Sequence, residues 1–83
     1  MEKRLGIIGI VIEDPQRTEQ VNNILHQFAE LFLGRMGIPC KERGIGVITL
    51  IADGTTDQLS ALTGALGRIN GVSVKSMLSK QIN

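Results

Sequence analysis

The chain has 83 residues, a single cysteine and a formal net charge of +1, so one small domain over residues 1–83 is expected, without an internal disulfide. Its nine basic residues are scattered and its two aromatic residues fall within helical periodicity, which argues against direct binding of nucleic acid. No stretch approaches the roughly 20 apolar residues of a membrane span and no signal peptide is evident, so a cytoplasmic protein is expected.

Residues 4–13 are predicted to form a strand that is apolar on both faces. The stretch RLGIIGIVIE has three apolar side chains at odd-numbered positions and three isoleucines at even-numbered positions. Successive side chains of a strand point to opposite faces of its sheet. One layer of helices can therefore cover only half of this apolar surface.

A helix is predicted to follow, starting at Asp14 and Pro15. Aspartate is a favoured helix cap, and proline fits the first helical turn, where its missing N–H costs nothing. Gly34 marks the predicted end of the helix. Its apolar positions recur with a 3.6-residue period. They are Val21, Ile24, Leu25, Phe28, Leu31 and Phe32.

Two strands joined by a turn are predicted next. Residues 35–42 form the weaker one, which should lie at a sheet edge because Pro39 has no N–H to donate. The turn at residues 42–44 leads into residues 45–53, IGVITLIAD, which are again apolar on both faces.

Thr55 or Thr56 is expected to cap a second helix, and Gln58 stands where a capping box from Thr55 would place it. A final strand is predicted over residues 72–78, after a turn at Asn70-Gly71. The second helix is expected to bury Leu59, Leu62, Ala65, Leu66 and Ile69.

The order β-α-β-β-α-β predicts an α+β fold. We expect a ferredoxin-like sandwich, with a four-stranded antiparallel sheet and two helices on one face. The two most apolar strands, at residues 4–13 and 45–53, suit the centre of the sheet. The strands with proline or with Ser and Lys suit its edges.

Short motifs in the chain resemble known regulators. The second half, LSALTGALGRINGVSVKSM, is similar to the ACT-like and nickel-responsive-regulator C-terminal-like superfamily. With VIED at 11–14, QVN at 20–22 and LH at 25–26, the whole chain more narrowly resembles the family of iron-only hydrogenase system regulators. The resemblance implies an ACT-like regulatory domain that is not an enzyme and is linked to iron-only hydrogenase expression or maturation.

The same comparison marks three departures from better-known relatives. One His and one Cys are too few for a nickel site of the nickel-responsive kind. No DNA-binding ribbon-helix-helix segment precedes the first strand. The turn after that strand lacks the glycine of the Asp-x-Pro-Gly sequence that amino-acid-binding ACT domains favour.

Four residues are candidate contacts for an effector. Asp14 and Pro15 lie at the turn after the first strand, although Asp14 also suits a purely structural cap. Gly64 and Gly67 fall on the outward face of the second helix, where each glycine costs about 1 kcal/mol relative to alanine. A close approach of a partner or ligand to the backbone would explain both glycines. Tolerated loss of helicity near Asn70-Gly71 is the alternative.

The odd-numbered sheet face is expected to lie away from the helices, because it carries Gly9, Glu13 and a threonine. Its remaining apolar side chains are too many to leave in water. We therefore predict a homo-dimer or tetramer, formed by an isologous partner sheet or by edge-to-edge extension with stacking. The predicted interface comprises Leu5, Ile7, Val11, Val47, Thr49 and Ile51.

No cofactor or metal is expected. His26 falls on the polar face of the first helix, which is typical of a surface histidine. Cys40 follows Pro39 in the edge strand and suits an idle or packed thiol. A metal at either residue would need ligands from another subunit, and that alternative stays open.

Three functions are compatible with the sequence. The favoured one is a non-enzymatic regulatory or ligand-sensing module that oligomerises and binds a small effector or a partner protein at subunit boundaries. The second is a structural interaction subunit without a ligand, in which no polar cavity would form at the interface. The third is a small ferredoxin-like enzyme, which would need His26 or Glu13 to line a pocket.

Overall fold

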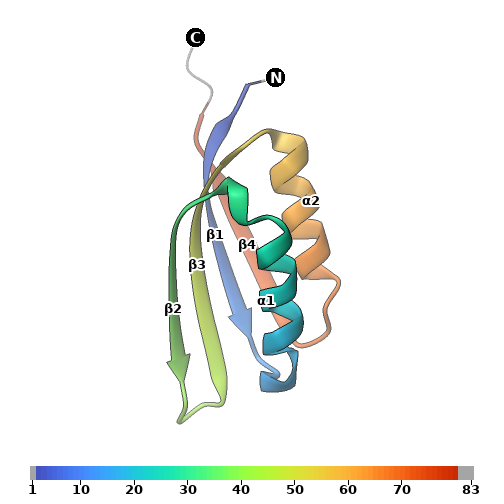
Figure 1. Cartoon of the computed structure of the whole chain (residues 1–83). Helices are drawn as coiled ribbons and strands as arrows, with labels where there is room; N and C mark the ends of the chain where they lie inside the picture. Colours follow the sequence, from blue (N-terminus) through green and yellow to red (C-terminus); the bar gives the residue numbers. More distant parts are fainter. Residues whose placement is uncertain (1, 81–83) are drawn as a thin grey trace.

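The structure is a computed structural model that describes residues 2–80. Four strands form one antiparallel sheet in the order β2-β3-β1-β4, and both helices cover the same face of it (Figure 1). This is the ferredoxin-like βαββαβ sandwich predicted from the sequence. Its elements are β1 (Arg4–Ile12), η1 (Pro15–Arg17), α1 (Thr18–Gln27), η2 (Ala29–Leu31), β2 (Phe32–Cys40), β3 (Ile45–Gly54), α2 (Thr56–Gly67) and β4 (Val72–Leu78).

The central strands are β1 and β3, as predicted. Their antiparallel register sets Ile8 opposite Leu50 and Ile10 opposite Ile48, so the even-numbered side chains of both strands share the face that the helices cover. These side chains join those of both helices in one core. The buried set is Ile8, Ile10, Ile12, Val21, Leu25, Leu31, Ile48, Leu50, Ala52, Leu59, Leu62, Leu66 and Ile69.

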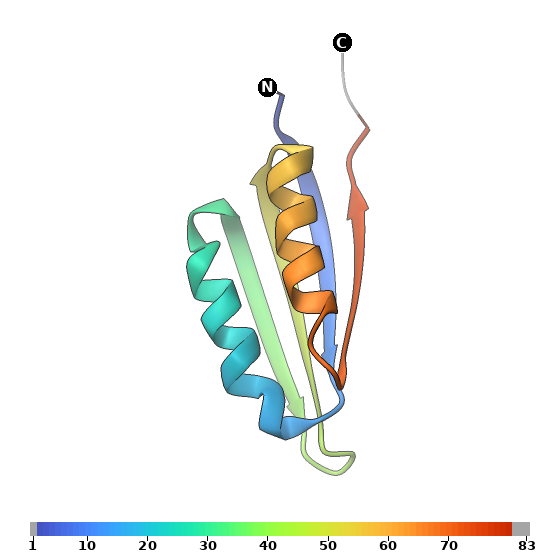
Figure 2. The same ribbon diagram turned by 90° about the vertical axis from the view of Figure 1, so that its right-hand side faces the viewer.

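The edge strands are β2 and β4, also as predicted. Pro39 lies near the end of β2, at the edge of the sheet, where a residue without an N–H is tolerated. In β4, Val72 and Val74 face the core, whereas Ser73 and Lys75 face away from it. The helices divide this sheet between them, with α1 toward the β2 edge and α2 toward the β4 edge (Figure 2).

The predicted end of the first helix at Gly34 is wrong, because α1 ends at Gln27. The single turn η2 follows, and Phe32 already belongs to β2, where it pairs with Ala52. Leu31 nevertheless reaches the core, at 7% exposure. A 3-10 turn repeats every three residues, so it brings Leu31 to the same side as Phe28 without a longer α-helix.

Both predicted caps are present. Asp14 Oδ1 accepts the backbone N–H of Gln16 at 3.0 Å, and Pro15 holds the first position of η1, the 3-10 turn that leads into α1. At α2, Thr55 Oγ1 accepts the N–H of Gln58 at 3.1 Å, while Gln58 Oε1 accepts the N–H of Thr55 at 2.9 Å. This reciprocal pair is the capping box expected from the sequence.

The second helix is shorter than its predicted apolar set. Ile69 is buried at 6% exposure, but it follows Gly67, the last residue of α2. Ala65 is only partly buried, because it lies to one side of the stripe of leucines. Within residues 2–80, neither helix has the length and apolar character needed to cross a bilayer.

Candidate functional site

The sheet face that no helix covers, called here the open face, is apolar along its length (Figure 1). Of the six predicted interface residues, Leu5 is 50% exposed, Ile7 48%, Val47 39% and Ile51 46%, and Val11 and Thr49 are half-buried by their neighbours on the sheet. The structure thus places all six on the expected face. Whether that face is an interface stays a prediction.

Three further apolar residues belong to the open face and were missed by the sequence analysis. Met36 and Ile38 of β2 pair with Thr49 and Val47 of β3, and Met77 of β4 pairs with Ile7. All three side chains are more than half exposed. The alternation of Met36 and Ile38 along β2 was the available signal for two of them, whereas Met77 follows Ser73 and Lys75 on the same side of β4.

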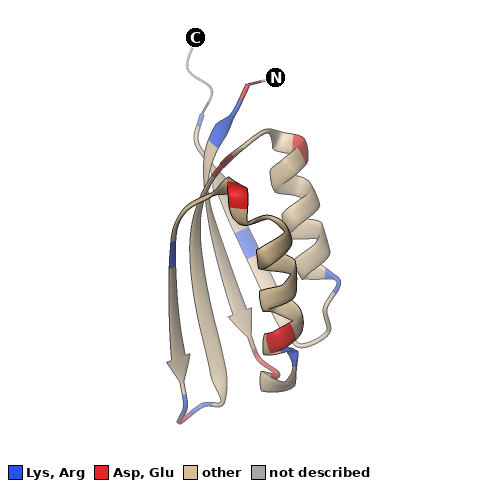
Figure 3. Ribbon diagram, viewed as in Figure 1, with Lys and Arg blue, Asp and Glu red and all other residues tan. Residues whose placement is uncertain are grey.

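Polar side chains on the open face include Thr49 and Asp53 of β3, and others lie on β4 and just after β1. Lys75 pairs with Gly9, and Ser73 Oγ donates to a carboxylate oxygen of Glu13 at 2.6 Å. The charged residues otherwise gather in the turns and on the helices, so the sheet is mostly tan in Figure 3. A shallow, largely apolar hollow of about 350 Å³ lies at one end of the face. It is lined by Leu5, Gly6, Ile7, Ile51, Met77, Leu78 and Ser79.

A second hollow, called here the hairpin groove, lies between the β2–β3 hairpin and the start of α1. Its volume is about 380 Å³. Core residues Ile12 and Ile48 line it from the sheet, and Thr18 and Asn22 line it from α1. Pro15, just before α1, also lines it.

The groove exists because the hairpin lacks long side chains on its helix-facing side. On β2, Gly37 pairs with Ile48 and Pro39 pairs with Gly46, and both Ile48 and Gly46 lie on the helix-facing side of β3. A Cβ added at Gly37 would lie 3.9 Å from Ile48 Cγ1, and one at Gly46 would lie 3.9 Å from Ile12 Cβ. Both are ordinary van der Waals distances, so a Cβ would fit at either glycine without a clash, and glycine there leaves the hairpin backbone without a side chain.

The charged residues that line the hairpin groove are Arg35 and Lys41, and both are cationic. Arg35 projects from β2 toward α1, where its Nη2 donates a hydrogen bond of 2.7 Å to Asn22 Oδ1. This bond spans the groove and holds the guanidinium beside it. The alternation Arg35-x-Gly37-x-Pro39 is the signal in the sequence that could have indicated this site.

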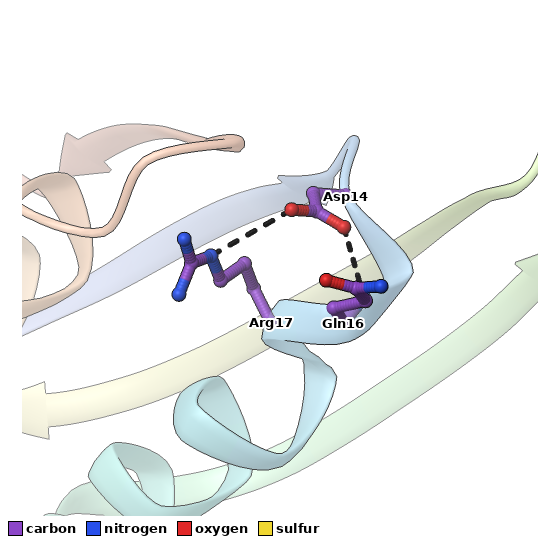
Figure 4. A network of polar contacts seen from close by, with 3 residues as sticks. All are labelled: Asp14, Gln16 and Arg17. Carbon is purple, nitrogen blue, oxygen red and sulfur yellow. Dashed lines mark hydrogen bonds and ion pairs between the residues drawn. The ribbon is translucent and has the colours of Figure 1, made fainter.

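The four predicted effector contacts do not come together. Pro15 lines the hairpin groove, whereas Asp14, Gly64 and Gly67 do not. The carboxylate of Asp14 is engaged locally, since Oδ1 caps η1 and Oδ2 lies 3.7 Å from Nε of Arg17 (Figure 4). Its geometry is that of a structural cap with an adjacent ion pair.

The two α2 glycines lie in uncrowded surroundings. A Cβ at Gly67 would meet no atom within 4 Å, and one at Gly64 would meet only Nη2 of Arg68, at 3.9 Å. No contact among residues 2–80 therefore requires glycine at either position. An approach by another molecule at these residues stays a prediction.

His26 and Cys40 are both exposed, and Cys40 also lines the hairpin groove. Among residues 2–80, no group of three or more His, Cys, Asp or Glu side chains is placed to hold a metal ion. Neither His26 nor Glu13 lines the groove or the hollow on the open face. These are the two residues that the enzyme hypothesis needed in a pocket.

Comparison with known proteins identifies the family. The sequence model of the TM1266-like family, described as "Iron-only hydrogenase system regulator, putative", matches residues 4–76. The chain belongs to this family. It is 42% identical to TM1266, an uncharacterized protein from Thermotoga maritima, whose structure matches with a TM-score of 0.91 over 95% of this chain and 100% of that one. The resemblance drawn from the sequence is thereby confirmed.

More distant structures share the fold of this TM1266-like protein. An unknown protein from Galdieria sulphuraria is 11% identical, with a TM-score of 0.64 over 99% of this chain and 48% of that chain. The apo form of CPII, a nitrogen regulatory PII-like protein from Thiomonas intermedia K12, is 12% identical, with a TM-score of 0.54 over 92% of this chain and 91% of that one. CPII bound to ADP, AMP and bicarbonate is 15% identical, with a TM-score of 0.52 over 94% of this chain and 92% of that one.

At these identities the likeness to the two distant proteins shows the fold alone. A search of curated proteins found no significant match. The family membership thus rests on the sequence model and on TM1266, and it indicates a regulatory module.

Proposed function

We propose that this TM1266-like protein is a non-enzymatic regulatory module that pairs with copies of itself through the open face and binds a small effector. The observation that carries the proposal is the row of half-exposed aliphatic side chains on the central strands, such as Ile7 and Ile51. Burying the remaining half of one such side chain contributes about 1 kcal/mol. Several such side chains together therefore favour a partner that covers the open face.

The size of the open face suits a second copy of the chain. The longest strand, β3, has 10 residues and spans about 33 Å, and the molecule is 19 Å across, so the open face offers roughly 600 Å², somewhat below the area per partner in a standard protein interface. The face also carries little charge that a copy would have to neutralise. An isologous pair would set each row of aliphatic side chains against its own counterpart.

The regulatory role is supported by the family, whose description names iron-only hydrogenase systems. We propose that assembly and effector binding together set the expression or maturation of such a hydrogenase. The open face and the partly polar hairpin groove, which adjoin at Ile38 and Val47, supply two surfaces, one for assembly and one for a signal. A module without a ligand would need only the first surface.

The proposed function is tested by deleting the gene in its native host and measuring hydrogenase transcript and activity. Deletion should change both, and the wild-type gene should restore them. Ile51→Lys, which puts a charge on the open face, should not restore them. Ser76→Lys is the matched control, since Ser76 is exposed on β4 and pairs with Ile8 on the helix-facing side. Unchanged hydrogenase levels after deletion would contradict the proposal.

A further inference from the structure

We propose that the hairpin groove binds a small organic anion that has an apolar body. The proposal rests on the proposed function, because it assigns a place and a chemical class to the effector. The volume of about 380 Å³ lies within the roughly 300–1,000 Å³ of small-molecule sites. The groove is therefore large enough for a ligand of metabolite size and too small for a folded partner.

The apolar part of such a ligand would lie against the sheet. Ile12 and Ile48 face the groove from β1 and β3, and both belong to the rigid core. Gly37 and Gly46 leave the backbone of the hairpin bare beside them. Glycine inside a strand weakens it, and it often marks a place where a ligand approaches the backbone closely.

The anionic part is indicated by charge. Arg35 and Lys41 line the groove, and no Asp or Glu lines it with them. Guanidinium groups bind planar anions such as carboxylates through two parallel hydrogen bonds. Arg35 is already oriented by its bond to Asn22, which takes up one of its five N–H donors. The remaining donors and the Lys41 ammonium supply positive charge at the rim of an apolar hollow.

The test uses two fluorescent probes with similar aromatic rings. 8-Anilinonaphthalene-1-sulfonate carries one negative charge, and N-phenyl-1-naphthylamine carries none. Each is titrated into the ¹⁵N-labelled full chain, and the backbone amide signals report where it binds. We expect the anionic probe to shift the amides of Arg35, Gly37, Lys41 and Gly46, and to bind there more tightly than the neutral probe.

Variants separate charge from shape. Arg35→Gln should weaken binding of the anionic probe at the groove about tenfold, since a hydrogen bond to a charged group is lost, and should leave the neutral probe unaffected. Lys75→Gln makes the same change of charge on the open face and should leave the binding of both probes at the groove unchanged. Gly37→Leu should fill the groove and abolish binding of both probes there. If Gly37→Leu does not fold, Arg35→Gln decides the question.

Three results would overturn the proposal. They are groove amides that do not respond to the anionic probe, equal binding of the neutral probe at these amides, and an Arg35→Gln variant that binds like the wild type. Assembly is measured separately by light scattering on the same samples. A monomeric protein whose groove amides respond would refute the interface and keep the ligand site. An oligomer whose groove amides do not respond would refute the ligand site and keep the interface.

Discussion

Gly71 lies directly against Asp14. Its carbonyl oxygen accepts the N–H of Asp14 at 3.1 Å and that of Glu13 at 2.7 Å, and a Cβ added at residue 71 would lie 2.6 Å from Asp14 Cβ. The φ of Gly71 is +82°, in the left-handed region that favours glycine. This contact joins the turn after β1 to the turn before β4, so it ties the start of the α1 connection to the end of the α2 connection.

Gly71→Ala should destabilise the protein by about 1–3 kcal/mol or more, because the strained φ and the clash with Asp14 act together. Urea unfolding followed by circular dichroism measures the change. Gly67→Ala is the control, since its Cβ would meet nothing within 4 Å, and it should leave stability unchanged or slightly raised. Equal midpoints for Gly71→Ala and wild type would show that the contact is not as tight as described.

Gly64→Ala should raise the free energy of unfolding by up to about 1 kcal/mol, because alanine favours a helix interior and the added Cβ has room beside Arg68. If another molecule approaches the backbone at Gly64, the same variant should fail to restore hydrogenase levels in the deletion strain. A more stable protein that restores them fully would favour tolerated loss of helicity instead.

Thr55→Ala should lower stability by about 1 kcal/mol, because the hydroxyl that accepts the backbone N–H of Gln58 is lost. The measurement is the shift of the urea midpoint. Thr56→Ala, one residue later and outside the box, serves as the matched control and should change it much less. A midpoint for Thr55→Ala equal to that of the control would exclude a contribution from the cap.

The sheet could be predicted because its evidence is local. Alternation in residues 4–13 and 45–53 separates the two faces of each strand, and the proline at 39 assigns an edge. The end of α1 could not be predicted in this way. Phe28, Leu31 and Phe32 fit a helical period, and only the pairing of Phe32 with Ala52 shows that the strand has begun.

The hairpin groove was missed for a different physical reason. It is defined by side chains that are absent, at Gly37 and Gly46, and by Arg35 reaching across to Asn22 in another element. The alternation of Arg35, Gly37 and Pro39 marks one face of a strand, but it does not show that Arg35 contacts Asn22, 13 residues away. The open face, by contrast, could be inferred because its aliphatic residues share one parity on the two central strands.

The account depends most on assembly through the open face, and light scattering at micromolar concentration tests it directly. One chain has a mass of 9.0 kDa. The wild-type protein should have a mass of two or four chains, Ile51→Lys should shift it toward one chain, and Ser76→Lys should leave it as in the wild type. A wild-type protein with the mass of one chain at that concentration would contradict the account.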